Sequence, residues 1–186
     1  LIADHPEIKK HLQRHTGEGR IAVIPYAADE IRTANASLLS QYGVEPNQFF
    51  LVIARPEPEN SILEIVRAFS KRPRGMKLVV LGNYRPDHPY HNAIKAAAND
   101  SVIFPGAIYD KEILQALRFF SACYVHGHTV GGTNPSLVEA LGAGSPILAH
   151  DNKYNRWVAG EGAMYFSDGA ECARLLDDIQ RGSVDI

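Results

Sequence analysis

Residues 126–150 contain the types and spacing that binding of a phosphate group would need. Gly131 and Gly132 form a candidate turn. Asn134 and Pro135 are typical of a helix start, because Asn caps free N–H groups and Pro fits the first helical position. At such a start the N–H groups and the helix dipole point the same way and favour an anion. The stretch therefore predicts a phosphate site built from backbone amides.

Glu139 lies a little over one turn into the same predicted helix. Its carboxylate would repel the bound anion, but it could accept two hydrogen bonds from a neighbouring vicinal diol such as that of a ribose. An anion site with such a carboxylate beside it indicates a pocket for a nucleoside diphosphate. Glycine turns and acidic residues are also ordinary at helix starts in any parallel α/β sheet, so this interpretation needs support from the rest of the chain.

The elements that position these residues alternate regularly from residue 49 onward. Short apolar strands are predicted at 49–54, 77–81, 102–104, 122–125, 146–150 and 163–166, and helices at 61–71, 91–98, 110–120, 135–143, 155–158 and 169–181. Strands that are apolar on both faces indicate a parallel sheet covered on both sides. We therefore predict a doubly wound, Rossmann-like α/β fold with a six-stranded parallel sheet.

The first 43 residues are less regular. They predict a helix over residues 6–15 capped by Asp4, a short apolar run at 21–24, a loop, and a helix over 31–42 that ends at Gly43. The start at Leu1, without a Met, is expected of a fragment of a longer protein.

Ligands of such sheets bind beyond the carboxyl ends of the strands. The residues at those ends are Arg55, Gly82, Asn83, Gly106, Ala107, Ile108 and the segment from His126 through Thr133 to Asn134. Arg55 could hold phosphate oxygens with its guanidinium group, or it could be a surface residue paired with Glu57 or Glu59.

Other chemistries find less support. His126 and His128 lie on one face of a strand, but no third ligand with suitable spacing makes a zinc site, so we expect them to hydrogen-bond a ligand and expect no metal. No Gly-x-Gly-x-x-Gly follows the first strand of the alternation, which argues against NAD. Ser136 has no esterase-type motif around it. We therefore expect no cofactor.

Composition excludes several classes of partner. A net charge of −2 and a pI near 6.5 give no basic surface for nucleic acid. No run approaches the roughly 20 apolar residues of a membrane span. Cys123 and Cys172 are isolated and have no metal spacing, which is typical of reduced cysteines in a cytoplasmic protein.

Most of the chain resembles the C-terminal, donor-binding domain of GT-B glycosyltransferases of the large family 4. The resemblance is carried by four segments: 51–60 with Arg55, 78–82, 102–106, and 133–149 with Glu139. It implies that Arg55 contacts the diphosphate, Glu139 the ribose, and the amides of Asn134 to Leu137 the phosphate. It also implies that residues 1–29 are the end of the N-terminal domain and the hinge, and that residues 30–186 are the donor-binding domain. Further ligand contacts are expected from Asn60, Gly131, Gly132, Thr133, Ser136 and Leu137.

Two positions depart from the family pattern. The family has a pair of glutamates eight residues apart, and the first falls on Gly131; it also has a Lys five residues after the Arg, where this chain has Asn60. The form Gly-Gly-Thr-Asn-Pro-Ser-Leu-Val-Glu-Ala is similar to that of a subgroup that includes rhamnosyltransferases using dTDP-rhamnose.

The resemblance implies a retaining, metal-independent hexosyltransferase of polysaccharide biosynthesis that uses a dTDP-, UDP- or GDP-linked sugar. The acceptor, a glycan or a lipid-linked saccharide, would bind through the N-terminal domain, so this chain alone is expected to be inactive. The full-length protein is expected in the cytoplasm, at the periphery of the inner membrane. Two alternatives stay open: a GT-B sugar-nucleotide epimerase, and a non-catalytic α/β binding module.

Overall fold

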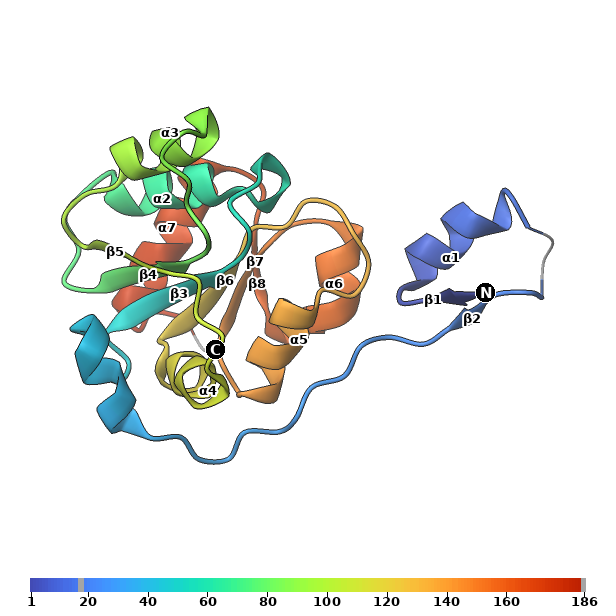
Figure 1. Ribbon diagram of the computed structural model, residues 1–186, viewed down its shortest axis with the longest axis horizontal. Coiled ribbons are helices and arrows are strands. Elements are labelled where there is room, and N and C mark those ends of the chain that lie inside the picture. Colours follow the sequence, from blue (N-terminus) through green and yellow to red (C-terminus); the bar gives the residue numbers. More distant parts are fainter. Residues whose placement is uncertain (17–18, 185–186) are drawn as a thin grey trace.

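A computed structural model describes residues 1–16 and 19–184 of the chain. Its main body is a six-stranded, entirely parallel sheet of order β5-β4-β3-β6-β7-β8 (Figure 1). The strands are β3 Phe49–Ile53, β4 Lys77–Leu81, β5 Val102–Gly106, β6 Cys123–His126, β7 Ile147–His150 and β8 Met164–Phe166. The predicted six-stranded parallel sheet is confirmed.

Helices cover both faces of the sheet, as Figure 1 shows. One face carries α2 Ile62–Ser70, α3 Pro89–Ala97 and α7 Gly169–Gln180, and the other carries α4 Lys111–Phe120, α5 Pro135–Gly142 and α6 Lys153–Ala159. Side chains of β3 alternate between two cores: Phe50 and Val52 pack with α2 and α7, while Phe49 and Leu51 pack with α4 and α5. Burial on both faces explains why the strands are apolar throughout.

The sheet has a switch point between β3 and β6. From β3 the chain builds outward through β4 to β5, and then returns to the other side of β3 with β6. The loops that follow β3 and β6 therefore diverge at neighbouring strand ends, which is where ligands bind in doubly wound sheets. Arg55 lies in the first of these loops, and residues 127–134 form the second.

An N-terminal unit lies beside this body. Its strand β1 Ile2–Ala3 pairs in parallel with β2 Ala22–Val23, and α1 Pro6–Gln13 connects them. The ring of His5 lies 4.6 Å from that of Trp157 on α6, and Lys153 pairs with Glu7 at 2.7 Å. Residues 24–35, without helix or strand, then run past α5 to the body (Figure 1). The domain boundary predicted after residue 29 falls within this segment and stays a prediction.

Local structure differs from expectation near the N-terminus. His5, not Asp4, caps α1, because its Nδ1 accepts the N–H of Glu7 at 3.0 Å. The helix predicted over 31–42 is wrong: residues 31–35 form neither helix nor strand, and only η1, a 3-10 helix at Ala36–Tyr42, forms after the cap Asn35. Two short 3-10 helices, η2 Pro58–Asn60 and η3 Gly160–Gly162, complete the fold. Within residues 1–16 and 19–184, none of the helices has the length and apolar character of a membrane span.

Candidate nucleotide-sugar site

A cavity of ≈ 670 Å³ opens at the carboxyl ends of β3, β4 and β5. The loops after these strands and the start of α5 contribute most of the residues predicted from the sequence. They are Arg55, Gly82, Asn83, Ala107, Ile108, Asn134 and Ser136. Gly106 lies just behind them and accepts the N–H of Gly82 at 3.1 Å. Residues up to 81 positions apart in the chain thus meet in one hollow, whose size suits a small-molecule ligand.

Two guanidinium groups face this cavity. Arg55 is exposed, and it forms no ion pair with Glu57, Glu59 or any other acid in the part of the chain that the structure describes. The predicted alternative, a surface pair with Glu57 or Glu59, is therefore not present. Arg85, which the sequence analysis did not single out, lines the same cavity from the loop after β4. Its position three residues beyond Gly82 was the signal available. The two positive charges suit an anionic ligand.

Asn60 does not face the cavity, contrary to expectation. Its side chain is buried, with 3% exposed, and its Nδ2 donates to the carbonyl oxygen of Arg55 at 2.7 Å. Gly127 permits this packing, because a Cβ there would overlap the carbonyl oxygen of Asn60. The residue in the place of the family's Lys thus shapes the loop that carries Arg55.

The first turn of α5 offers fewer free amides than predicted. The N–H of Ser136 donates to Asn134 Oδ1 at 3.1 Å, and the N–H of Leu137 donates to the Asn134 carbonyl at 3.1 Å. The side chain of Leu137 is fully buried in the core. Within the described ranges, the N–H groups of Thr133 and Asn134 donate to no other group. Of these two residues only Asn134 lines the cavity, so its amide is the one available there to an anion.

The hydroxyl of Ser136 anchors α5 to the sheet. It donates to the carbonyl oxygen of Ile53 at 3.0 Å and also contacts the hydroxyl of Tyr124, which donates to the same carbonyl at 3.1 Å. Burial raises the pKa of Tyr124 to about 12, so this phenol stays protonated. Ser136 thus fixes the height of the helix start above the end of β3.

The turn before α5 faces the N-terminal unit instead of the cavity. Gly132 lies against Asp4 so closely that a Cβ would overlap the Asp4 carboxylate. Thr133 is buried, and its hydroxyl donates to the Asp4 carbonyl. Gly131 is exposed with φ of 125°. None of the three lines the cavity, so the structure does not place them where they were predicted to contact the ligand.

His126 and His128 stack with ring centroids 4.3 Å apart and planes 8° from parallel. His126 is buried. Neither nitrogen of its ring has a hydrogen-bond partner within residues 1–16 and 19–184. His128, not His126, reaches the cavity. Burial lowers the pKa of His126 well below its usual range. Burial, with help from the Arg55 charge, lowers that of His128 to about 4. Both rings are therefore neutral at neutral pH. In the described ranges no three metal-ligating side chains converge.

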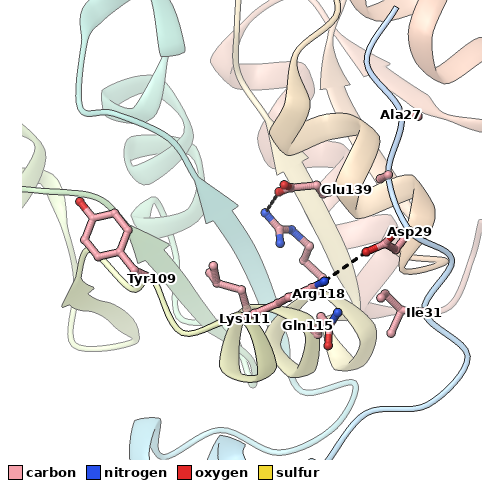
Figure 2. A pocket seen from close by; sticks show the side chains of 10 residues that line it. Ala27, Asp29, Ile31, Tyr109, Lys111, Gln115, Arg118 and Glu139 are labelled. Carbon is pink, nitrogen blue, oxygen red and sulfur yellow. Dashed lines mark hydrogen bonds and ion pairs between the residues drawn. The ribbon is translucent and has the colours of Figure 1, made fainter.

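Glu139 lines a second cavity of ≈ 510 Å³, bounded by α4, α5 and residues 27–31 (Figure 2). Its carboxylate pairs with Arg118 of α4, and the ion pair between Lys111 and Asp29, at 3.2 Å, joins α4 to the segment opposite (Figure 2). Tyr109 lines both cavities and is 88% exposed. The carboxylate predicted to bind a diol thus lines a different cavity from Arg55, and the exposed ring of Tyr109 is common to both cavities.

Known proteins resemble this chain in sequence and in fold. The family model described as glycosyl transferases group 1 matches residues 39–179. An alpha-monoglucosyldiacylglycerol synthase of Streptococcus pneumoniae is 30% identical over 193 residues; the match covers 96% of this chain and 42% of that protein. The chain thus spans less than half the length of this relative.

Solved glycosyltransferase structures share the fold at low sequence identity. Anabaena Alr3699/HepE, in complex with UDP and glucose, superposes with a TM-score of 0.79 at 18% identity; the match covers 99% of this chain and 53% of that one. A glycosyltransferase from Rickettsia africae gives a TM-score of 0.80 at 15% identity, over 96% and 52% of the two chains. The six-stranded parallel sheet with helices on both faces matches the C-terminal domains of GT-B glycosyltransferases. With the family model matching residues 39–179, the chain belongs to the group 1 glycosyl transferases.

Proposed function

We propose that this chain binds the donor of a glycosyltransferase, a nucleoside diphosphate sugar, and that sugar transfer takes place at the Arg55 cavity. The observation that carries the proposal is the convergence of Arg55, Arg85 and the free amide of Asn134 at one cavity beyond the strand ends. Two guanidinium groups and a helix N-terminus suit a diphosphate. Ala107, Ile108 and Tyr109 would receive the base, and Glu139 the ribose.

These groups also suit the chemistry of the leaving group. When the glycosidic bond to phosphate breaks, negative charge grows on the departing diphosphate. Positive groups fixed in place before the reaction stabilise that charge without further rearrangement. Arg55 would take this role, so we propose a metal-independent transfer, and from the family resemblance a retaining one.

Donor and acceptor are the finer part of the proposal. Anabaena HepE binds UDP and UDP-glucose, which supports a nucleotide sugar as the ligand class. Gly131 supplies no carboxylate for the transferred sugar, so a 6-deoxy sugar with fewer hydroxyls, such as that of dTDP-rhamnose, is the donor to test first. The pneumococcal relative is named for a glycolipid product, which supports a lipid-linked acceptor. A glycan acceptor and a place at the cytoplasmic side of a membrane are proposed from the family resemblance alone.

Titration of the 186-residue chain with dTDP, UDP and GDP tests the proposal, by NMR or calorimetry. Half of a two-domain cleft should bind with a dissociation constant of about 0.1–1 mM, roughly 4–5.5 kcal/mol. Arg55→Ala should weaken binding at least about tenfold. Arg67→Ala is the matched control, because Arg67 is exposed on α2, away from both cavities.

Three results would contradict the proposal. If none of the three nucleotides binds at several millimolar, the chain is better described as a binding module of another kind. If Arg55→Ala and Arg67→Ala change affinity equally, the diphosphate does not bind at Arg55. A full-length enzyme that converts a nucleotide sugar without any acceptor would favour the epimerase.

A further inference from the structure

Glu139 is held by a cation that the family resemblance did not indicate. Arg118 comes from the last turn of α4, and its Nη2 contacts Glu139 Oε2 (Figure 2). The two side chains differ in exposure: 8% for Arg118 and 48% for Glu139. The pair therefore joins a buried cation to a half-exposed carboxylate that lines the ≈ 510 Å³ cavity.

The backbone that carries Arg118 is fixed from behind. Its carbonyl oxygen accepts the hydroxyl of Ser121 at 3.0 Å and that of Ser145 at 2.8 Å, and both serines are buried. The Nε of Arg118 is buried without a hydrogen-bond partner among the residues described. The serines thus fix the backbone of Arg118, and the contact that its buried guanidinium makes with an acidic side chain is the one to Glu139.

Glu139 is the acidic partner of Arg118 in the described part of the chain. Removing one partner of a buried ion pair leaves an uncompensated charge and is costly. The Glu139 carboxylate is thus held towards Arg118 by one of its two oxygens. Its other oxygen, Oε1, accepts no hydrogen bond from residues 1–16 or 19–184, and the side chain lines the cavity.

We propose that Arg118 is a positioning residue that acts through Glu139, holding one carboxylate oxygen so that the other is presented to the hydroxyls of the nucleoside's sugar. The inference rests on the proposed function, because it needs a nucleotide in the site. Arg118 is then part of how the site recognises the sugar hydroxyls, although it makes no contact with base or phosphate. The simpler possibility is that the pair only joins α4 to α5.

A ligand that lacks the hydroxyls separates these two roles. We would measure dissociation constants of the 186-residue chain for UDP and for 2′,3′-dideoxy-UDP, which has the same base and diphosphate. The variants are Arg118→Met, Arg118→Lys, Glu139→Gln and the double variant Arg118→Met with Glu139→Gln. Thermal melts establish that each variant is folded.

If Arg118 acts through Glu139, Arg118→Met should weaken UDP about tenfold, the loss of roughly one charge-assisted hydrogen bond, and dideoxy-UDP less than about twofold. Arg118→Lys should recover part of the UDP affinity. The double variant should bind UDP no more weakly than Glu139→Gln alone, because the two residues act in series.

Equal weakening of both nucleotides by Arg118→Met would overturn the inference and leave a purely structural pair, as would additive losses in the double variant. If Arg118→Met does not fold, Arg118→Lys gives the same decision from the ratio of the two affinities. Failure of the proposed function looks different, because the unmodified chain would then bind neither nucleotide.

Discussion

The hydrogen bond from Asn60 to Arg55 allows a quantitative prediction about the loop that would bind the diphosphate. Replacing Asn60 by Ala removes a buried Nδ2 donor that lies 2.7 Å from the Arg55 carbonyl oxygen. That oxygen keeps a second donor, the N–H of Glu57 at 2.8 Å. The loss is therefore partial, and we place it at about 1–2 kcal/mol of unfolding free energy, the lower part of the range for a buried polar group.

Asn92 provides a matched control. Its Nδ2 also donates to a backbone carbonyl, that of Pro86 at 2.9 Å, but this bond is exposed to water. Asn92→Ala should change stability by less than about 0.5 kcal/mol, since exposed substitutions away from special features do little. The two variants thus compare the same kind of hydrogen bond in a buried and in an exposed setting.

Urea unfolding and thermal melting of the 186-residue chain measure the difference. About 1–2 kcal/mol corresponds to a midpoint lowered by roughly 2–8 °C in a chain of this length. Because the same bond shapes the loop that carries Arg55, affinity for a nucleoside diphosphate should fall together with stability in Asn60→Ala. Equal stability of the Asn60 and Asn92 variants would refute the reasoning on burial. Lost stability with unchanged affinity would show that Asn60 does not position Arg55.

Four further predictions concern pH, packing, metal and the isolated chain. The folded pKa of His128 is about 4, against 6.5 when unfolded, so the unfolded state binds more protons between these values; stability should fall by up to about 3 kcal/mol as pH drops from 6.5 to 4. In urea titrations across this range, His128→Gln should weaken the dependence of the unfolding free energy on pH, and His11→Gln, at an exposed position, should not. Gly132→Ala should destabilise by about 1–3 kcal/mol through overlap with Asp4, and adding Asp4→Gly should restore part of the loss; independent, additive effects would exclude that contact. Excess EDTA should leave the full-length enzyme active, and rescue by Mn²⁺ or Mg²⁺ would disprove the proposed role of Arg55. Given donor and acceptor, the 186-residue chain should yield no transfer product by mass spectrometry, because positioning of reactants can supply roughly 7–11 kcal/mol and one side of the cleft would be missing; clear product would mean that the catalytic groups lie within this chain.

The fold could be predicted because the strands and helices of this chain have clear local sequence patterns. Apolar strands such as Phe49–Ile53 alternate with helices whose caps are visible in the sequence, among them Asn134 before α5 and Asp110 before α4. The prediction of a helix over residues 31–35 failed because this segment lies against α5, where the Ile31 N–H donates to the Gly142 carbonyl at 2.8 Å. That contact is tertiary and leaves no local pattern.

The site could be predicted only where position at a strand end was enough. Arg55, Asn83 and Ile108 needed no further information to be placed at one cavity. Arg118 could not be found in this way, because its sequence context is the polar face of an amphipathic helix, and it is α5 that buries it against Glu139. His126 and His128 share a face as expected, but which of them reaches the cavity depends on how deeply β6 lies in the sheet.

The packing of His5 against Trp157 gives the protein a built-in optical reporter. Trp157 is the only tryptophan in the sequence, and it lies on the body of the molecule with its ring 4.6 Å from an imidazole of the N-terminal unit. Its emission therefore depends on whether that unit is docked. A red shift would follow release of the unit into water, without any label having to be attached. Fluorescence during a nucleotide titration would then show whether filling the cavity loosens or tightens the hold on residues 1–16, on the same sample and in the same minutes in which binding is measured.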